Sequence, residues 1–166
     1  DEDEPRNAGC AAEMLERGDW VTPWFNGELR THKPVMLYWL MMSAYSLFGV
    51  NEFSARFWAA VLGTGTLLLT YLIGARLFDA KRGLLAAVIL ASTITPVMLS
   101  RAATPDAVLI FPMTLAIAIY VVAVTGKTSG SRMSVDYPSD RRVLVLMYGV
   151  MGLAVLAKGP LGLILP

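Results

Sequence analysis

Polar and apolar positions divide the chain into a charged opening segment and a long apolar remainder. Residues 1–34 are the longest polar stretch and begin with four carboxylates in a row, followed by Pro5 and Arg6. Beyond Pro34, charged residues are sparse and long uncharged runs recur. Repeated apolar runs of this kind are typical of a protein built into a membrane.

The polar segment predicts a short amphipathic helix followed by a turn. An acidic residue before Pro5 is a typical helix start, because a carboxylate caps the first turn and proline fits its fixed geometry. Apolar residues recur at helical spacing as far as Leu15, and Gly18 follows where a C-terminal cap is expected. The pair Asn26-Gly27 then predicts a turn.

Residues 35–48 carry no charge and end at Gly49. A helix of this length reaches only about 21 Å, which is short of a ~30 Å hydrocarbon core. A helix lying in the membrane interface fits better, and Tyr38, Trp39 and Tyr45 favour that placement. We therefore predict a first domain, residues 1–51, that is an outer-face loop carrying two short interfacial helices.

Longer apolar segments follow and predict a second domain, residues 52–166, made of membrane spans. The predicted spans are 56–77, 83–101, 106–126 and 142–157, with the start of another at 159–166. Pro96 lies near the end of the second, where backbone groups freed by proline need other partners. The polar residues 127–142 between two spans are predicted to be disordered. The expected fold class is all-α, a polytopic transmembrane helix bundle, and we expect a further span to precede Asp1.

Composition supports a membrane protein and excludes other classes. Hydrophobic residues make up 55% of the chain and charged residues 16%, against about a quarter charged in soluble domains. Mean hydropathy is +0.55. The net charge of +1 gives no sign of a nucleic-acid partner. Cys10 is the sole cysteine, so the chain has no internal disulfide and no metal-thiolate cluster.

Counting the predicted spans places distant charged residues on one side of the membrane. Asp106 lies two crossings after the opening loop, so it shares a face with Asp3 and Lys33. Lys158 joins them after two more crossings. Arginine and lysine are evenly divided between the two faces, so the positive-inside rule does not set the orientation.

Asp106 has an ordinary and a functional interpretation. Pro105-Asp106 at the mouth of a span could be simple helix capping. Alternatively, Asp106 could pair with Asp3 or Glu4, because carboxylates held near one another and near cations are suited to taking a proton from an acceptor.

Arg6 and Lys33 are cations in an acidic segment. They could be solvated partners of nearby carboxylates, each worth under about 1 kcal/mol. They could instead stabilise a departing lipid phosphate, a contact worth roughly 3 kcal/mol of barrier. The acidic quartet could bind a divalent cation, although a solvated cap is the favoured interpretation, and we assign no metal ligands. His32 is the sole histidine and is given no catalytic role.

Taken in order, the short motifs resemble a known family. They are Asp3-Glu4-Pro5-Arg6, Gly18-Asp19-Trp20, Asn26-Gly27, Lys33-Pro34, Tyr38-Trp39, Phe48-Gly49-Val50-Asn51-Glu52, Ala55-Arg56, Thr104-Pro105-Asp106 and Lys158-Gly159-Pro160. The series is similar to the polyprenyl-phosphate-sugar-dependent glycosyltransferases of the membrane-embedded C-type fold, which include the lipid A aminoarabinose transferases and the protein mannosyltransferases. The resemblance covers nearly the whole chain.

The resemblance implies a role for particular residues. It implies that Asp3 is catalytic, with Glu4 as its acidic neighbour and Asp106 as a second carboxylate of the site. It implies that Arg6 and Lys33 hold the lipid phosphate, and Lys158 is added to them from its placement on the same face. His32 stands where these enzymes usually have Glu, which leaves a metal contact there without support.

The expected activity is inverting transfer of a sugar from a polyprenyl phosphate to a lipid A-like or protein acceptor. The expected location is the outer face of a bacterial inner membrane, in a multi-pass protein surrounded by membrane lipids. No nucleotide is needed at this step, no cofactor is certain, and a divalent metal is possible. The alternatives are a transporter or structural membrane subunit, and a phosphatase of phosphate-bearing lipids.

Overall fold

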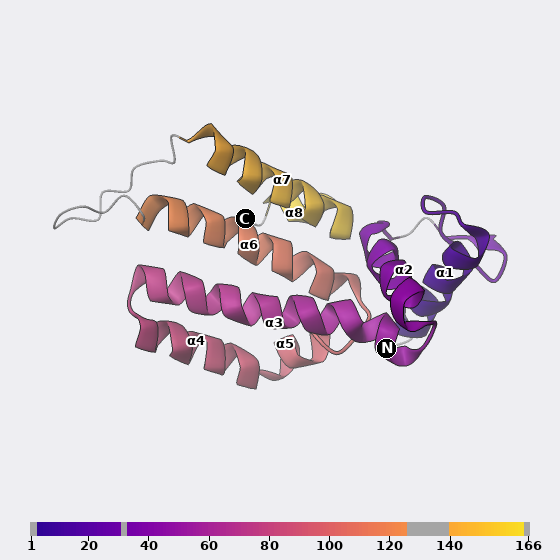
Figure 1. Ribbon diagram of the computed structural model, residues 1–166, viewed down its shortest axis with the longest axis horizontal. Coiled ribbons are helices and arrows are strands. Elements are labelled where there is room, and N and C mark those ends of the chain that lie inside the picture. Colours follow the sequence, from indigo (N-terminus) through magenta and orange to yellow (C-terminus); the bar gives the residue numbers. More distant parts are fainter. Residues whose placement is uncertain (1–2, 31–32, 126–139, 165–166) are drawn as a thin grey trace.

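Two long helices, α3 (Glu52–Leu77) and α6 (Pro105–Thr125), lie side by side at the centre of a helix bundle (Figure 1). The structure is a computed structural model that describes residues 3–30, 33–125 and 140–164. Within these residues, α3 and α6 are the two helices long and apolar enough to cross a membrane. Asn51 caps α3 by accepting a hydrogen bond from the Ser54 amide at 2.9 Å.

The segment predicted as one span at 83–101 is built from two helices. Helix α4 (Ala80–Ser92) begins at its cap Asp79 and ends before Thr93, whose backbone is extended. Helix α5 (Ile94–Leu99) then begins, with Pro96 in its first turn. Proline has no N–H to donate and clashes with the carbonyl four residues earlier, whereas a first turn accommodates it.

On the other side of α6 lies α7 (Arg141–Lys158), capped by the Asp140 side chain (Figure 1). After Gly159, which has a φ of +71°, the chain reverses into the short α8 (Leu161–Ile164). Of the polar segment predicted to be disordered, residues 127–142, all but the last three residues lie outside the described residues.

The opening segment folds onto one end of the bundle as helix α1 (Asp3–Arg17), a small hairpin and helix α2 (Met36–Phe48) (Figure 1). Gly18 ends α1 with a φ of +67°, as the sequence predicts. The hairpin pairs β1 (Trp24–Phe25) with antiparallel β2 (Glu28–Leu29). Asn26 and Gly27 both have positive φ, at 53° and 79°, which is the combination that a tight hairpin turn requires.

The main core joins this opening segment to the bundle. It is built from buried residues of α1, α2 and the adjacent ends of α6 and α7: Cys10, Ala11, Met14, Leu37, Tyr38, Met41, Met42, Tyr45, Val108, Leu109, Ala154 and Ala157. Because burial of apolar surface contributes about 25 cal/mol per Å², this core fixes α1 and α2 against the helix ends. The expected all-α bundle with two short helices on one face is confirmed, with the hairpin as an addition.

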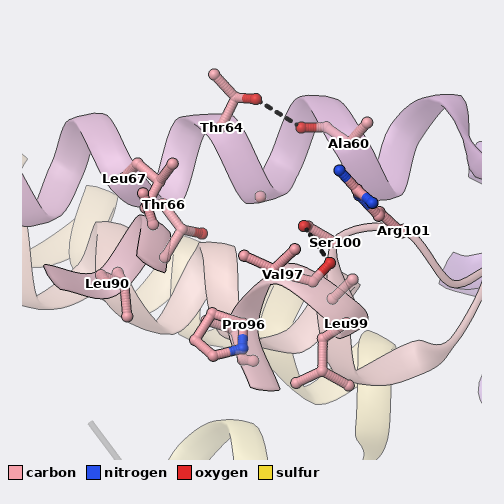
Figure 2. A pocket seen from close by; sticks show the side chains of 14 residues that line it. Ala60, Thr64, Thr66, Leu67, Leu90, Pro96, Val97, Leu99, Ser100 and Arg101 are labelled. Atoms are coloured by element: carbon pink, nitrogen blue, oxygen red, sulfur yellow. Dashed lines mark hydrogen bonds between the residues drawn. The ribbon is translucent and has the colours of Figure 1, made fainter. Parts of the chain in front are cut away.

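A cavity of about 230 Å³ lies within the bundle, between α3, α4, α5 and α6 (Figure 2). Its polar side chains include Thr64 and Ser100, whose hydroxyls donate to carbonyls of their own helices, those of Ala60 and Val97. None of the six predicted site residues lines it. The candidate chemistry is therefore elsewhere, at the end of the bundle where α1 sits.

Candidate functional site

Asp3 begins α1 and is held by two cations. Its Oδ2 accepts a hydrogen bond from Lys33 Nζ at 2.6 Å, and its Oδ1 lies 3.5 Å from Arg30 Nη2. Lys33 stands just before α2 and Arg30 just after β2, so the hairpin brings both back to the start of α1. The hydrogen bond from Lys33, followed by the charges of Lys33, Arg30 and Arg6, holds the pKa of Asp3 below its usual value, although burial opposes the shift. Asp3 is therefore ionised at neutral pH.

Asp106 lies in the first turn of α6, and its carboxylate pairs directly with the Lys158 ammonium at the end of α7. The helix begins at Pro105, one residue before Asp106, so Asp106 is inside the first turn rather than at the capping position. Its side chain is thus engaged with another helix, and its functional interpretation stays a prediction.

Both of these ion pairs line one cavity of about 420 Å³. Asp3, Lys33, Thr104, Asp106 and Lys158 are among its lining residues, and we call it the carboxylate cavity. Four places in the chain contribute to it: the start of α1, the start of α2, the start of α6 and the end of α7. The parity of spans predicted that these charges share one face, and the structure brings them together.

A second cavity, of about 620 Å³, adjoins the first and shares Asp3 and Lys33 with it. Arg6 and Arg30 also line it, so we call it the arginine cavity. The Arg30 side chain is only 13% exposed, and its Nη1 is buried with no hydrogen-bond acceptor among the described residues. Arg6 is exposed beside it. Three cations therefore surround Asp3 on this side.

Glu4 does not line either cavity. Its Oε1 accepts hydrogen bonds from Arg56 Nε of α3 at 2.7 Å and from the Ala103 amide at 3.1 Å. Burial raises the pKa of Glu4, but the hydrogen bonds from Arg56 and Ala103 outweigh it and leave the pKa below its usual value. Asn7, one turn later on α1, donates from Nδ2 to the Ala103 carbonyl at 3.2 Å. The Glu4 carboxylate thus joins α1 to α3 and to the loop before α6.

Arg30 and Asn7 stand in no motif that the sequence offers for the site, and Arg56 was expected at the flank of a span. Arg30 is one residue past a hairpin strand, so recognising it requires the fold of the Asn26-Gly27 turn. Arg56 lies at the end of a predicted span, where arginine is common in any membrane helix. Asn7 would have drawn notice only as an amide one turn after Asp3 on the same helix.

No metal site can be assembled from the residues that the structure describes: no three Asp, Glu, His or Cys side chains lie close enough together to hold an ion. Asp1, Glu2 and His32, the other residues bearing on this expectation, lie outside the described ranges. The possible divalent cation stays a prediction.

Comparison with known proteins agrees with this geometry. The profile of the family described as dolichyl-phosphate-mannose-protein mannosyltransferase matches residues 8–166. An uncharacterised protein of Aquifex aeolicus is 36% identical over 96% of the chain and 30% of its own length. The undecaprenyl phosphate-alpha-4-amino-4-deoxy-L-arabinose arabinosyl transferase of Shewanella sediminis is 30% identical over 99% of the chain and 29% of its own length.

A solved structure of a related protein is similar to this chain in three dimensions as well. The crystal structure of ArnT from Cupriavidus metallidurans, bound to undecaprenyl phosphate, superposes with a TM-score of 0.85 and 27% identity. That match covers 99% of this chain and 29% of ArnT, so the chain spans about 30% of the length of these relatives. The chain therefore belongs to the dolichyl-phosphate-mannose-protein mannosyltransferase family, a family of membrane glycosyltransferases that use polyprenyl-phosphate sugars.

Proposed function

We propose that the protein containing this chain transfers a sugar from a polyprenyl phosphate to a lipid or protein acceptor, with inversion, at the outer face of a bacterial inner membrane. The carrying observation is that Asp3, Lys33, Asp106 and Lys158 line one cavity although they come from four separate segments. Bacterial relatives are named as transferases that use undecaprenyl phosphate, which supports a polyprenyl-phosphate donor and a bacterial membrane as the location.

The cations are assigned to the donor phosphate. Lys33 belongs to both cavities, Arg6 lines the arginine cavity and Lys158 lines the carboxylate cavity. A phosphate between them gains charge as its bond to the anomeric carbon breaks, and cations already in place stabilise that charge without reorganising. Because Lys33 and Lys158 are paired with carboxylates before the donor binds, phosphate entry shifts their contacts from carboxylate oxygen to phosphate oxygen.

The carboxylates are assigned to the acceptor. Asp3, ionised and 45% exposed, can accept a hydrogen bond from an acceptor hydroxyl or amine. The acceptor heteroatom attacks the anomeric carbon, the bond from that carbon to the phosphate oxygen breaks, and the acceptor proton passes to Asp3. A carboxylate with a lowered pKa holds a proton weakly, so Asp3 orients the acceptor first and takes the proton late in the step. Asp106 shares the cavity and assists.

The test uses the full-length protein in membrane vesicles with a radiolabelled polyprenyl-phosphate sugar and, in separate arms, a lipid A-type lipid and a peptide acceptor. We expect Asp3→Asn and Lys33→Ala each to lower transfer by about 100-fold or more, the range for losing a proton acceptor or a preplaced electrostatic contact. Glu16→Gln, an exposed acid of the same helix, is the matched control and should leave transfer unchanged.

Release of free polyprenyl phosphate separates the proposal from its rivals. A transferase releases it only when an acceptor is supplied, a lipid-phosphate hydrolase cleaves one ester bond of the donor with water and no acceptor, and a transporter leaves the donor intact. Full activity of either variant would remove Asp3 or Lys33 from the proposed site. An intact donor in every arm would contradict the proposed function itself.

A further inference from the structure

One peptide unit of the loop before α6 is held by two side chains of α1. The Ala103 amide donates to Glu4 Oε1 at 3.1 Å, and the Ala103 carbonyl accepts from Asn7 Nδ2 at 3.2 Å. Glu4 and Asn7 are one turn apart, so they lie on the same face of α1. We call these two contacts the Ala103 clasp.

The Asn7 half of the clasp is buried, the Glu4 half is partly buried, and a third element supports the clasp. Asn7 is 0% exposed and Ala103 1% exposed. Arg56 of α3 donates from Nε to Glu4 Oε1 at 2.7 Å, so the same oxygen receives both the Ala103 amide and the guanidinium. Hydrogen bonds shielded from water are costly to lose, because each leaves an unpaired group behind. The clasp therefore fixes α1 against both α3 and the loop.

The position of the clasp links it to the two carboxylates. Asp3 is the residue before Glu4, and Asp106 comes three residues after Ala103, at the start of α6. The residues between Ala103 and Asp106, Thr104 and Pro105, are buried. A short, buried connection on one side and adjacency on the other thus link the clasp to Asp106 and Asp3.

We propose that Glu4 and Asn7 are positioning residues, whose clasp on the Ala103 peptide sets the separation of Asp3 and Asp106 across the carboxylate cavity. This inference rests on the proposed glycosyl transfer. It replaces the role that family resemblance implied for Glu4: the Glu4 carboxylate contacts Arg56 and Ala103, and Glu4 is not among the residues that line the carboxylate cavity.

The substitution Glu4→Gln distinguishes a positioning role of Glu4 from a role as an acidic group of the reaction. Both hydrogen bonds go to one oxygen, Oε1, and a glutamine carbonyl can accept both. In the full-length protein we expect Glu4→Gln to keep kcat within about tenfold of wild type, with the KM for the donor and the pH profile unchanged. Glu4→Ala, which removes the acceptor, should lower kcat by about 100-fold with little change in KM. A Glu4→Gln variant that folds normally and is as inactive as Glu4→Ala would overturn the proposal.

Asn7 supplies an independent arm. Asn7→Ala removes the other half of the clasp and should also lower kcat rather than raise KM. Because both residues hold the same peptide, the Glu4→Ala, Asn7→Ala double variant should lose little more than the worse single variant. Fully multiplicative losses would contradict a shared clasp. Thermal unfolding in detergent identifies variants that fail to fold. If the alanine variants do not fold, the activity of Glu4→Gln decides the proposal.

Failure of this inference is distinguishable from failure of the proposed function. If wild type transfers sugar and Asp3→Asn does not, the transferase proposal stands whatever Glu4→Gln does. If wild type leaves the donor intact, the transferase proposal fails, and there is then no transfer reaction for which the clasp positions Asp3 and Asp106.

Discussion

At the scale of single residues, the ionisation of Asp3 is the property most directly set by its neighbours. Its pKa lies below the ordinary 3.8 because Lys33 and the two nearby arginines favour the charged carboxylate. A folded pKa below the unfolded one means that the ion pairs stabilise the fold above about pH 4. That contribution disappears only as the pH falls through the lowered pKa.

Arg30→Gln tests this electrostatic account. Removing one of the cations that lower the pKa of Asp3 should move it toward its ordinary value, so the acid-side loss of transfer should begin at a higher pH than in wild type. The measurement is the pH profile of kcat/KM in the full-length protein. Arg17→Gln, which removes an exposed arginine at the far end of α1, is the control. An acid limb that stays in place, or moves to lower pH, would contradict the account.

The residues of the site differ in how far sequence could reveal them. Asp3, Lys33 and Asp106 were singled out because they belong to an ordered series of motifs, and span counting put them on one face. Arg30 could not be predicted, because its contact with Asp3 depends on how the hairpin folds back. The side-chain direction of Glu4 was equally inaccessible, since adjacent helical residues point about 100° apart and only the packed structure shows which one faces the cavity.

At the scale of elements, the packing of α3 against α4 depends on two glycines. A Cβ at Gly83 would lie 2.6 Å from the Tyr71 carbonyl oxygen, and one at Gly74 would lie 2.7 Å from the Gly83 Cα. We expect Gly83→Ala to push the helices apart and destabilise the protein by about 1–3 kcal/mol, the usual cost of overpacking. The measurement is thermal unfolding in detergent.

Gly149→Ala provides the matched control for that substitution. Gly149 lies in α7, and a Cβ there meets nothing within 4 Å among the described residues. Alanine is favoured over glycine in a helix by about 1 kcal/mol, so this variant should be as stable as wild type or slightly more so. Equal melting temperatures for the two alanine variants would show that the α3–α4 contact is looser than the structure indicates.

Elements with one strong local signal were predicted well, and elements shaped by competing signals were not. Helix α1 has a proline start and a glycine stop, and it was predicted nearly to the residue. The uncharged run containing Pro96 reads as one span, because apolar composition dominates over a single proline. The break at Thr93 arises because the helix restarts where Pro96 fits its first turn. The two-residue strands flanking Asn26-Gly27 are too short for an alternating pattern.

At the scale of the whole molecule, the site exists because antiparallel helices return the chain repeatedly to the same end. Helices α3 and α6 are anchored there by the core with α1 and α2, while the α3–α4 turn lies at the opposite end (Figure 1). Span counting predicted the shared face. It could not predict a shared cavity, because parity fixes the side of the membrane and leaves lateral position open.

The same arrangement allows thiol labelling to test the orientation proposed for the full-length protein in the membrane. Cys10 is the sole cysteine of the chain and is buried, so in a Cys10→Ala background a single introduced thiol in this region reports on one location. Native cysteines elsewhere in the full-length protein must also be replaced.

If the site faces outward, Glu16→Cys at the α1 end should react with a membrane-impermeant maleimide added to intact cells. Lys81→Cys, beside the turn at the opposite end, should react only after the membrane is opened. Both positions are exposed in the structure, so unequal labelling reflects the membrane rather than burial. Labelling of Lys81→Cys in intact cells with protection of Glu16→Cys would place the carboxylate cavity on the inner face, where the proposed acceptors would have to be found instead.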